Sequence, residues 1–243
     1  MDSSRESGNA PPYWLAPFVH VSLCDRHAVL MDERRNCYVA VQPAEGLAGW
    51  VAGWPAGGTG AAAPLGAPPA ILAQLLEQGA LVSDRRAGSP ARPVEIAQPC
   101  RSLLEFDFEE YPAPHGRDLR RMAWAWTIAR AALQFRSMHW VLERMRARRA
   151  GRESSEAQFD WTHAQALVGR FVYLRPLFYT ARGACLLDSL TLLLFLQAHG
   201  LYPEWVFGVR TAPFHAHCWV QLGPVVFNDL PDHVRQYSAI LRI

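Results

Sequence analysis

The chain has 243 residues, of which 50% are hydrophobic, and its formal net charge is +2 at pH 7. This composition is typical of a globular protein and excludes a disordered chain, and the small net charge disfavours binding to bulk nucleic acid. The 5 cysteines are an odd number without disulfide-framework spacing, so we expect reduced thiols and a cytoplasmic protein. The sequence predicts neither a signal peptide nor a membrane-spanning segment.

The N-terminal part is predicted to be a small module preceded by a disordered tail at residues 1–14. An amphipathic helix is expected over 70–78, because its apolar residues fall on one face and a glycine follows it. Before this helix, runs of β-branched and apolar residues separated by short turns predict three strands, at 19–23, 28–31 and 37–41. Three strands followed by a helix indicate a winged-helix-like module over residues 15–84.

A second, larger domain is expected over residues 100–243, after a proline-containing linker at 85–99. Its first half is predicted to be helical, with one long helix over 118–149 and a further helical region over 159–179. Its second half begins with an apolar helical run at 186–199, and two short strands follow at 219–222 and 225–228. The whole chain is therefore predicted to have an α+β fold.

Cys185 is the candidate nucleophile of this domain, because it directly precedes the apolar helical run. A cysteine at a helix start lies at the positive end of the helix dipole, beside backbone N–H groups that have no partner in the helix. Both effects favour the thiolate, which is the nucleophilic form of cysteine, and the same N–H groups can stabilise an oxyanion.

The two strands suggest partners for this thiol. A hairpin centred on Gly223 would place His217 directly opposite Asp229, close enough for the carboxylate to orient the imidazole. In that register Asn228 points to the opposite face, which argues against it as the third member of a triad. His215 shares the face of His217 but would have no carboxylate opposite it, so we interpret it as a packing or substrate-lining residue.

A metal site is not expected. His215, His217 and Cys218 cluster in sequence, but strand alternation directs Cys218 to the other face. No second pair of cysteines or histidines has the spacing of a zinc site. The alternative for Cys185 itself is an inert core thiol, and the ordered set of Cys185, His217 and Asp229 argues against that interpretation.

The second half of the chain resembles the B proteins of lasso-peptide biosynthesis, which are transglutaminase-like cysteine peptidases. The resemblance extends from about Arg117 to the C-terminus. It departs from the family at Cys218, where alanine is common. The matching residues, in chain order, are Arg182, Cys185-Leu186, Ser189-Leu190, Gly200, Gly208-Val209, Ala216-His217-Cys218-Trp219-Val220 and Asp229.

The resemblance implies a transglutaminase-like (papain-like) α+β domain with Cys185 as nucleophile, His217 as general base and Asp229 as the residue that orients it. It implies a peptidase that removes the leader from a ribosomally made lasso-peptide precursor. The released core would pass to a separate asparagine-synthetase-like cyclase, which is the expected partner. The peptidase itself is expected to need no cofactor.

The N-terminal module resembles, more weakly, the precursor-recognition element that accompanies these peptidases. The resemblance implies that the leader adds a strand beside 37–41 while helix 70–78 closes the groove. The expected contact residues are Cys37, Tyr38, Val39, Val41, Leu72, Leu75 and Leu76. The helix has no basic residue, which disfavours DNA binding, and the alternative is that this face packs against the peptidase.

Two other functions remain open from the sequence. The same three residues would allow acyl transfer to an amine, as in true transglutaminases, if an amine and not water resolves the acyl-enzyme. A non-catalytic chaperone that presents the precursor to another enzyme is the third possibility, and the presence of Cys185, His217 and Asp229 argues against it.

Overall fold

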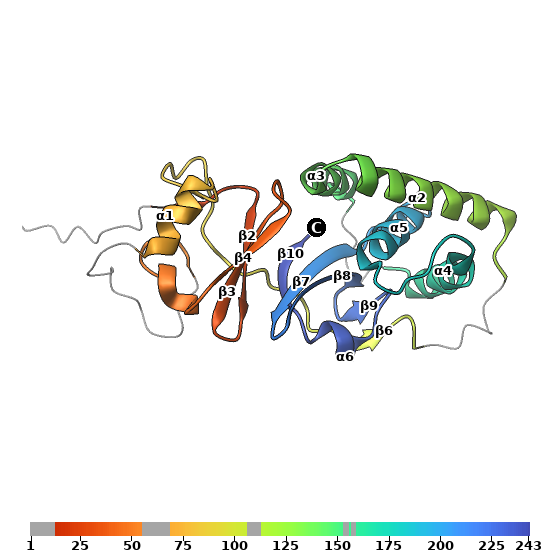
Figure 1. The fold of residues 1–243 in the computed structure, drawn as a ribbon. Coiled ribbons are helices and arrows are strands. Elements are labelled where there is room, and N and C mark those ends of the chain that lie inside the picture. Colours follow the sequence, from red (N-terminus) through yellow and green to blue (C-terminus); the bar gives the residue numbers. More distant parts are fainter. Residues whose placement is uncertain (1–12, 55–68, 106–112, 153–155, 157–158) are drawn as a thin grey trace, which may run out of the picture. The chain divides into compact units, whose positions relative to one another are not determined.

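A computed structural model describes residues 13–54, 69–105, 113–152, 156 and 159–243 of this chain (Figure 1). The chain forms two compact units, Met1–Pro93 and Val94–Ile243. The division falls inside the segment predicted to be a linker. Residues 1–12 of the predicted tail lie outside the described residues, whereas Trp14 belongs to a strand and not to a tail.

The N-terminal unit is built on a three-stranded antiparallel sheet in the order β2-β3-β4, so β4 lies at an edge. A two-stranded sheet of β1 and β5 accompanies it. The three predicted strands and the helix are confirmed. The elements are β1 (Trp14–Leu15), β2 (Val19–Cys24), β3 (His27–Asp32), β4 (Cys37–Val41), the 3-10 helix η1 (Ala44–Leu47), α1 (Ala70–Glu77) and β5 (Leu81–Val82).

This unit has its own apolar core, which joins the sheet to α1 and to the segment around η1. Leu30 of β3, Leu47 of η1 and Leu75 of α1 are all buried in it. The alternation of β2 is typical of a strand with one buried face, since Val19 and Val21 point into the core. Packing of its apolar face against the core stabilises α1, because a helix of this length is only marginally stable on its own.

The C-terminal unit is a five-stranded sheet, in the order β10-β7-β8-β9-β6, with helices packed on it. Strand β6 runs parallel to β9, and the other neighbours are antiparallel. The strands are β6 (Arg101–Ser102), β7 (Glu204–Thr211), β8 (Phe214–Leu222), β9 (Val225–Val226) and β10 (Ser238–Arg242). The helices are α2 (Gly116–Phe135), α3 (Met138–Arg149), α4 (Trp161–Leu174), the 3-10 helix η4 (Arg175–Leu177), α5 (Cys185–Gln197) and α6 (Pro231–Val234).

Helix α5 lies at the centre of this unit, between the sheet on one side and α2 and α4 on the other (Figure 1). Its residues from Asp188 to Leu196 are all buried, which explains why the run is apolar all round and not amphipathic. Gly200 follows the helix with a φ of 85°, a conformation that glycine adopts easily and that lets the chain turn into β7.

The prediction of one long helix over 118–149 is wrong, because α2 ends at Phe135 and α3 begins at Met138. Ser137 separates them, and its hydroxyl accepts a hydrogen bond from the Trp140 N–H at 3.2 Å, as an N-cap residue does. The start was also misplaced: Asp118 is not the cap but the third helical residue, where its carboxylate accepts from the His115 N–H.

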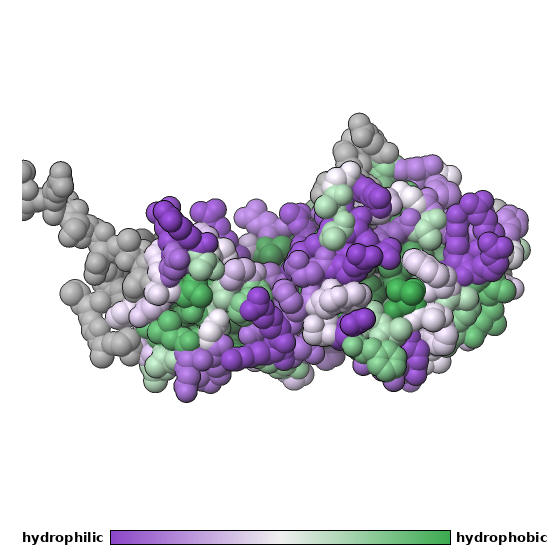
Figure 2. Space-filling model, turned by 90° about the horizontal axis from the view of Figure 1, so that it is seen from above, coloured by the Kyte–Doolittle hydropathy of each residue, from purple (hydrophilic) through white to green (hydrophobic). Residues whose placement is uncertain are grey.

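The outer side of α2 and α3 mixes large apolar side chains with arginines. Trp124 and Trp140 are exposed there, and the guanidinium groups of Arg148 and Arg136 lie over their rings. Figure 2 shows apolar patches interrupted by hydrophilic residues on the surface seen from above. Among the described residues, no helix has the length and apolar character needed to cross a membrane.

Candidate active site

The thiol of Cys185 lies where the sequence placed it, at the first residue of α5. Gly183 has a φ of 70° and turns the chain into the helix, so the thiol comes to lie at the helix start, where it is half-buried. The pKa of Cys185 is lowered to about 4, first by a hydrogen bond from the Cys218 thiol and then, against the opposing effect of burial, by the ring of His217. The thiolate is therefore the form present at neutral pH.

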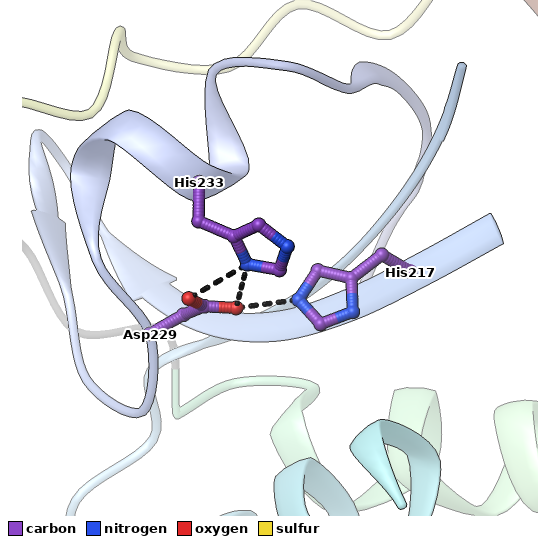
Figure 3. Close-up of side chains that lie close together, drawn as sticks. All are labelled: His217, Asp229 and His233. Carbon is purple, nitrogen blue, oxygen red and sulfur yellow. Dashed lines mark hydrogen bonds and ion pairs between the residues drawn. The ribbon is translucent and has the colours of Figure 1, made fainter. Parts of the chain in front are cut away.

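His217 of β8 joins this thiol to Asp229. Its Nε2 lies 2.5 Å from Asp229 Oδ2, and its other ring nitrogen points away from the carboxylate, leaving it for the thiol (Figure 3). Burial lowers the pKa of His217, but the hydrogen bonds with Asp229 and Cys185 outweigh it and raise the pKa to about 9. At neutral pH the pair is accordingly a thiolate and an imidazolium, as in enzymes that use an activated cysteine.

The contact between His217 and Asp229 arises in a way the sequence analysis did not foresee. Gly223 and Pro224 both occupy the turn, so the strand register differs by one residue from a hairpin centred on Gly223. The predicted register is therefore wrong. The observed pairs are Gln221 with Val226 and Leu222 with Val225.

A bend after β9, and not the strand ladder, brings Asp229 to His217. The Phe227 N–H still donates to the carbonyl of Val220 at 2.9 Å, but the chain then leaves the strand. The side chain of Asn228 replaces the next backbone hydrogen bond of the ladder: its Oδ1 accepts from the Val220 N–H at 2.9 Å, where a strand would offer a backbone carbonyl. With the side chain of Asn228 turned inward, Asp229 is free to face His217.

Asp188 is a site residue that the sequence analysis missed. It lies on the first turn of α5, is buried, and accepts hydrogen bonds from Arg175, Tyr179 and Asn228 at 3.2, 3.0 and 2.9 Å. Asn228 thus connects Asp188 to β8, which couples α5 to the segment that carries Asp229. The sequence did contain a signal for Asp188: it follows Cys185 by three residues, so the two residues lie on the same side of the helix.

His233 is the second residue that was missed. Its Nδ1 lies 2.9 Å from each carboxylate oxygen of Asp229, and its ring centroid lies 4.9 Å from that of His217 (Figure 3). Burial raises the pKa of Asp229, but the hydrogen bonds from His217, His233 and the Leu230 N–H outweigh it, so the pKa lies below its usual range. The sequence contains the signal as Asp229 and His233 four residues apart across a proline that begins α6.

Aromatic rings close around His217. The ring centroids of Tyr237 and Trp219 lie 5.1 and 5.9 Å from that of His217. Gly208, which pairs with His217 across β7 and β8, leaves room for both rings, because a Cβ there would lie 2.8 Å from Tyr237 Cβ and 2.9 Å from the Trp219 ring. His215 is exposed, and its Nδ1 lies 3.1 Å from the hydroxyl of Tyr237.

Cys218 lies on the opposite face of β8 from His217, as predicted, but it still influences Cys185. Strand alternation does turn it away from His217, but α5 packs on that side of β8. Its Sγ lies 3.3 Å from Ser189 Oγ, and its thiol and backbone N–H lower the pKa of Cys185. Burial raises the pKa of Cys218, so this second thiol stays protonated and acts as a donor.

A cavity of about 490 Å³ opens onto these groups. Its volume lies within the range of small-molecule binding sites, and its walls combine apolar surface with several charged and polar groups. The lining residues include Arg175, Gly183, Cys185, Asp188, His215, His217, Asn228, Asp229 and His233. His217, Asp229 and His233 also offer donor atoms within 4.8 Å of one another, a set that a divalent ion could use, although their mutual hydrogen bonds engage the same atoms.

The residues expected to bind a leader fall into two groups. Leu72, Leu75 and Val41 have exposures of 2%, 0% and 3% and belong to the core of the N-terminal unit, so they support its fold and do not form a groove floor. Cys37, Tyr38 and Val39 of β4 and Leu76 of α1 are partly exposed. Leader contact through these four residues stays a prediction.

Comparison with known proteins found a similar curated protein and a matching family model. The chain is 39% identical over 62 residues to the microcin J25-processing protein McjB of Escherichia coli, a match that covers 26% of this chain and 30% of that protein. The chain therefore spans less than a third of that relative's length in the match. No solved structure matches the chain. The model of the transglutaminase-like superfamily matches residues 129–242, which include Cys185, His217 and Asp229. The C-terminal unit is thus similar to the transglutaminase-like superfamily over most of its length.

Proposed function

We propose that this protein is a cysteine peptidase that cleaves the leader from a lasso-peptide precursor before a separate cyclase acts on the core. One observation carries the proposal: Cys185 at the start of α5 and His217 of β8 line the same cavity, His217 lowers the pKa of the thiol, and Asp229 holds the imidazole from the other side. The similarity to a microcin-processing protein supports the choice of a precursor peptide as substrate.

The chemistry follows from the positions of these groups. The Cys185 thiolate attacks the carbonyl carbon of the leader–core bond, and N–H groups of the first turn of α5 stabilise the oxyanion. His217 donates its proton to the leaving amine of the core, which leaves the leader as a thioester on Cys185. The neutral imidazole then accepts a proton from water, whose oxygen attacks the thioester and releases the leader carboxylate.

The N-terminal unit would supply the precursor. Strand β4 lies at an edge of the three-stranded sheet, which is where an extended peptide can add as a further strand. Cys37, Tyr38, Val39 and Leu76 are the partly exposed residues proposed to contact the leader. The expected partners are then the precursor and an asparagine-synthetase-like cyclase that takes the core.

The test uses the full chain with a precursor encoded near its gene, in water enriched in ¹⁸O. The expected result is one cut at the leader–core junction, with ¹⁸O in the new leader carboxylate and no cut by Cys185→Ala. Added primary amine separates the two acyl chemistries, since a leader amide without ¹⁸O would indicate acyl transfer. If the intact protein never cuts the precursor, with or without the cyclase, the peptidase proposal fails.

A further inference from the structure

Asp229 is bound by two imidazoles and not by one. His217 Nε2 approaches Oδ2 at 2.5 Å, and His233 Nδ1 lies 2.9 Å from both Oδ1 and Oδ2 (Figure 3). The Leu230 N–H donates to Oδ1 at 2.7 Å. These contacts fix the rotation of the carboxylate, because a carboxylate held only by His217 could turn about its side-chain bonds.

The backbone of this segment is also held. The Ser102 hydroxyl donates to the carbonyl of Asp229 at 2.6 Å, which ties it to β6. Arg235, at the end of α6, donates through Nε to the carbonyl of Pro99 at 2.7 Å. Helix α6 is therefore anchored, and the ring of His233 lies 5.5 Å from that of Tyr237 in an edge contact. His233 is thus a fixed donor although its side chain is 45% exposed.

We propose that His233 is a positioning residue of this site, which holds the carboxylate of Asp229 in the orientation that His217 needs. The inference rests on the proposed function for its role in cleavage, but the contact itself is independent of any substrate. His233 acts through the carboxylate of Asp229, to which its Nδ1 bonds; its ring centroid also lies 4.9 Å from that of His217, at the edge of the same cavity. Loss of this donor would leave the carboxylate with the Leu230 N–H and His217 alone, which would loosen its orientation and weaken its hold on the imidazolium.

The identity of the bonded nitrogen gives a sharp test. An asparagine side chain places its amide nitrogen near the Nδ1 position of histidine, whereas a glutamine places it near Nε2. Because Nδ1 is the donor here, His233→Asn should retain most activity, while His233→Ala and His233→Gln should lose it. We expect kcat for precursor cleavage to fall about 10- to 100-fold in the latter two, with little change in KM.

A second measurement needs no substrate. The rate at which iodoacetamide alkylates Cys185, measured from about pH 4, where this thiol ionises, up to neutral pH, reports the thiolate that His217 stabilises. Arginine-specific digestion gives a peptide of residues 183–210 that contains Cys185 and excludes the other cysteines, so mass spectrometry follows this thiol alone. His233→Ala and His233→Gln should slow alkylation, and His233→Asn should restore it, with unchanged melting temperatures.

The outcomes separate this inference from the proposed function. If no precursor is ever cleaved but alkylation still follows the order wild type, Asn, then Gln and Ala, the role of His233 stands and the peptidase proposal does not. If Ala, Asn and Gln variants all alkylate and cleave at the wild-type rate, His233 does not position Asp229. Equal loss in all three, including Asn, would also overturn the inference.

Discussion

The two units differ in what they bury. The N-terminal unit buries a continuous apolar cluster around residues such as Leu47 and Leu75, together with the polar side chains of Ser22, Asp32 and Glu33. The polar side chains buried in the C-terminal unit include Asp188, which lines its cavity, and Ser189 and Ser102. These groups are hydrogen-bonded to the elements that carry Cys185 and Asp229. Burying polar groups is costly unless they are paired, so their concentration marks the place where geometry matters most.

The largest effect is expected from a substitution that abolishes cleavage in the C-terminal unit and leaves leader binding by the N-terminal unit intact. Cys185→Ala should reduce precursor cleavage by more than about 10³-fold, because it removes the nucleophile, and should leave leader binding unchanged. The matched control is Cys100→Ala, which removes an exposed thiol outside the site. Cleavage is followed by mass spectrometry and binding by calorimetry. Leader release by Cys185→Ala at the wild-type rate would reject the nucleophile assignment.

The second prediction concerns two histidines of one strand. His217→Ala should be about as damaging as losing the thiol, whereas His215→Ala should cost no more than about tenfold. Asp229→Asn should fall between them, since an amide can hold the ring but cannot stabilise the imidazolium. Steady-state rates of the three folded variants decide this. Equal losses from His215→Ala and His217→Ala would contradict the assignment of His217, and not His215, as the histidine that Asp229 orients.

The pKa shifts predict the pH range of thiol reactivity. The thiolate of Cys185 forms as the pH rises through about 4, and the imidazolium of His217 persists until the pH passes about 9. Alkylation of Cys185 should therefore already be fast near pH 6, where an ordinary cysteine is about 10²- to 10³-fold less ionised. In His217→Ala the pH at which the alkylation rate of Cys185 rises should be higher than in the wild type. A wild-type rate that rises only above about pH 8 would exclude the ion pair.

The fourth prediction tests the buried polar network directly. Asp188→Ala should lower the free energy of unfolding by about 2–4 kcal/mol, because Arg175 and Asn228 lose their partner. The control is Asp232→Ala, which removes a carboxylate whose side chain is 94% exposed, and it should leave stability unchanged. Denaturant unfolding measures both. If Asp188→Ala were as stable as wild type, the network would not support the fold.

The smallest effect is expected in the N-terminal unit. In a Cys185→Ala background, Leu76→Asp should weaken leader binding about tenfold, because it places a carboxylate at a partly exposed apolar position of α1. Glu77→Gln on the same helix is the control and should bind normally. Calorimetry with the leader peptide measures the difference, and a matching melting temperature shows that the unit remains folded. Unchanged affinity would remove Leu76 from the proposed contact surface.

Much of the fold was predictable from the sequence, because apolar periodicity determines β2, β3, β4 and α5. The chemistry of Cys185, His217 and Asp229 was visible as ordered residue types. The hairpin register was not, because whether Pro224 joins the turn depends on packing around β9. The roles of Asp188, Asn228 and His233 were missed for a related reason: each is defined by hydrogen bonds between distant segments, and pattern analysis detects faces and not networks.

Asn228 has a consequence for how this protein should respond to temperature. Its amide connects Asp188 on α5 to Val220 on β8, while α5 itself is held by an apolar core. Warming loosens such a polar bridge before it opens a packed core. The optimum temperature of the reaction should therefore lie below the melting midpoint of the unit, and activity lost between those two temperatures should return on cooling.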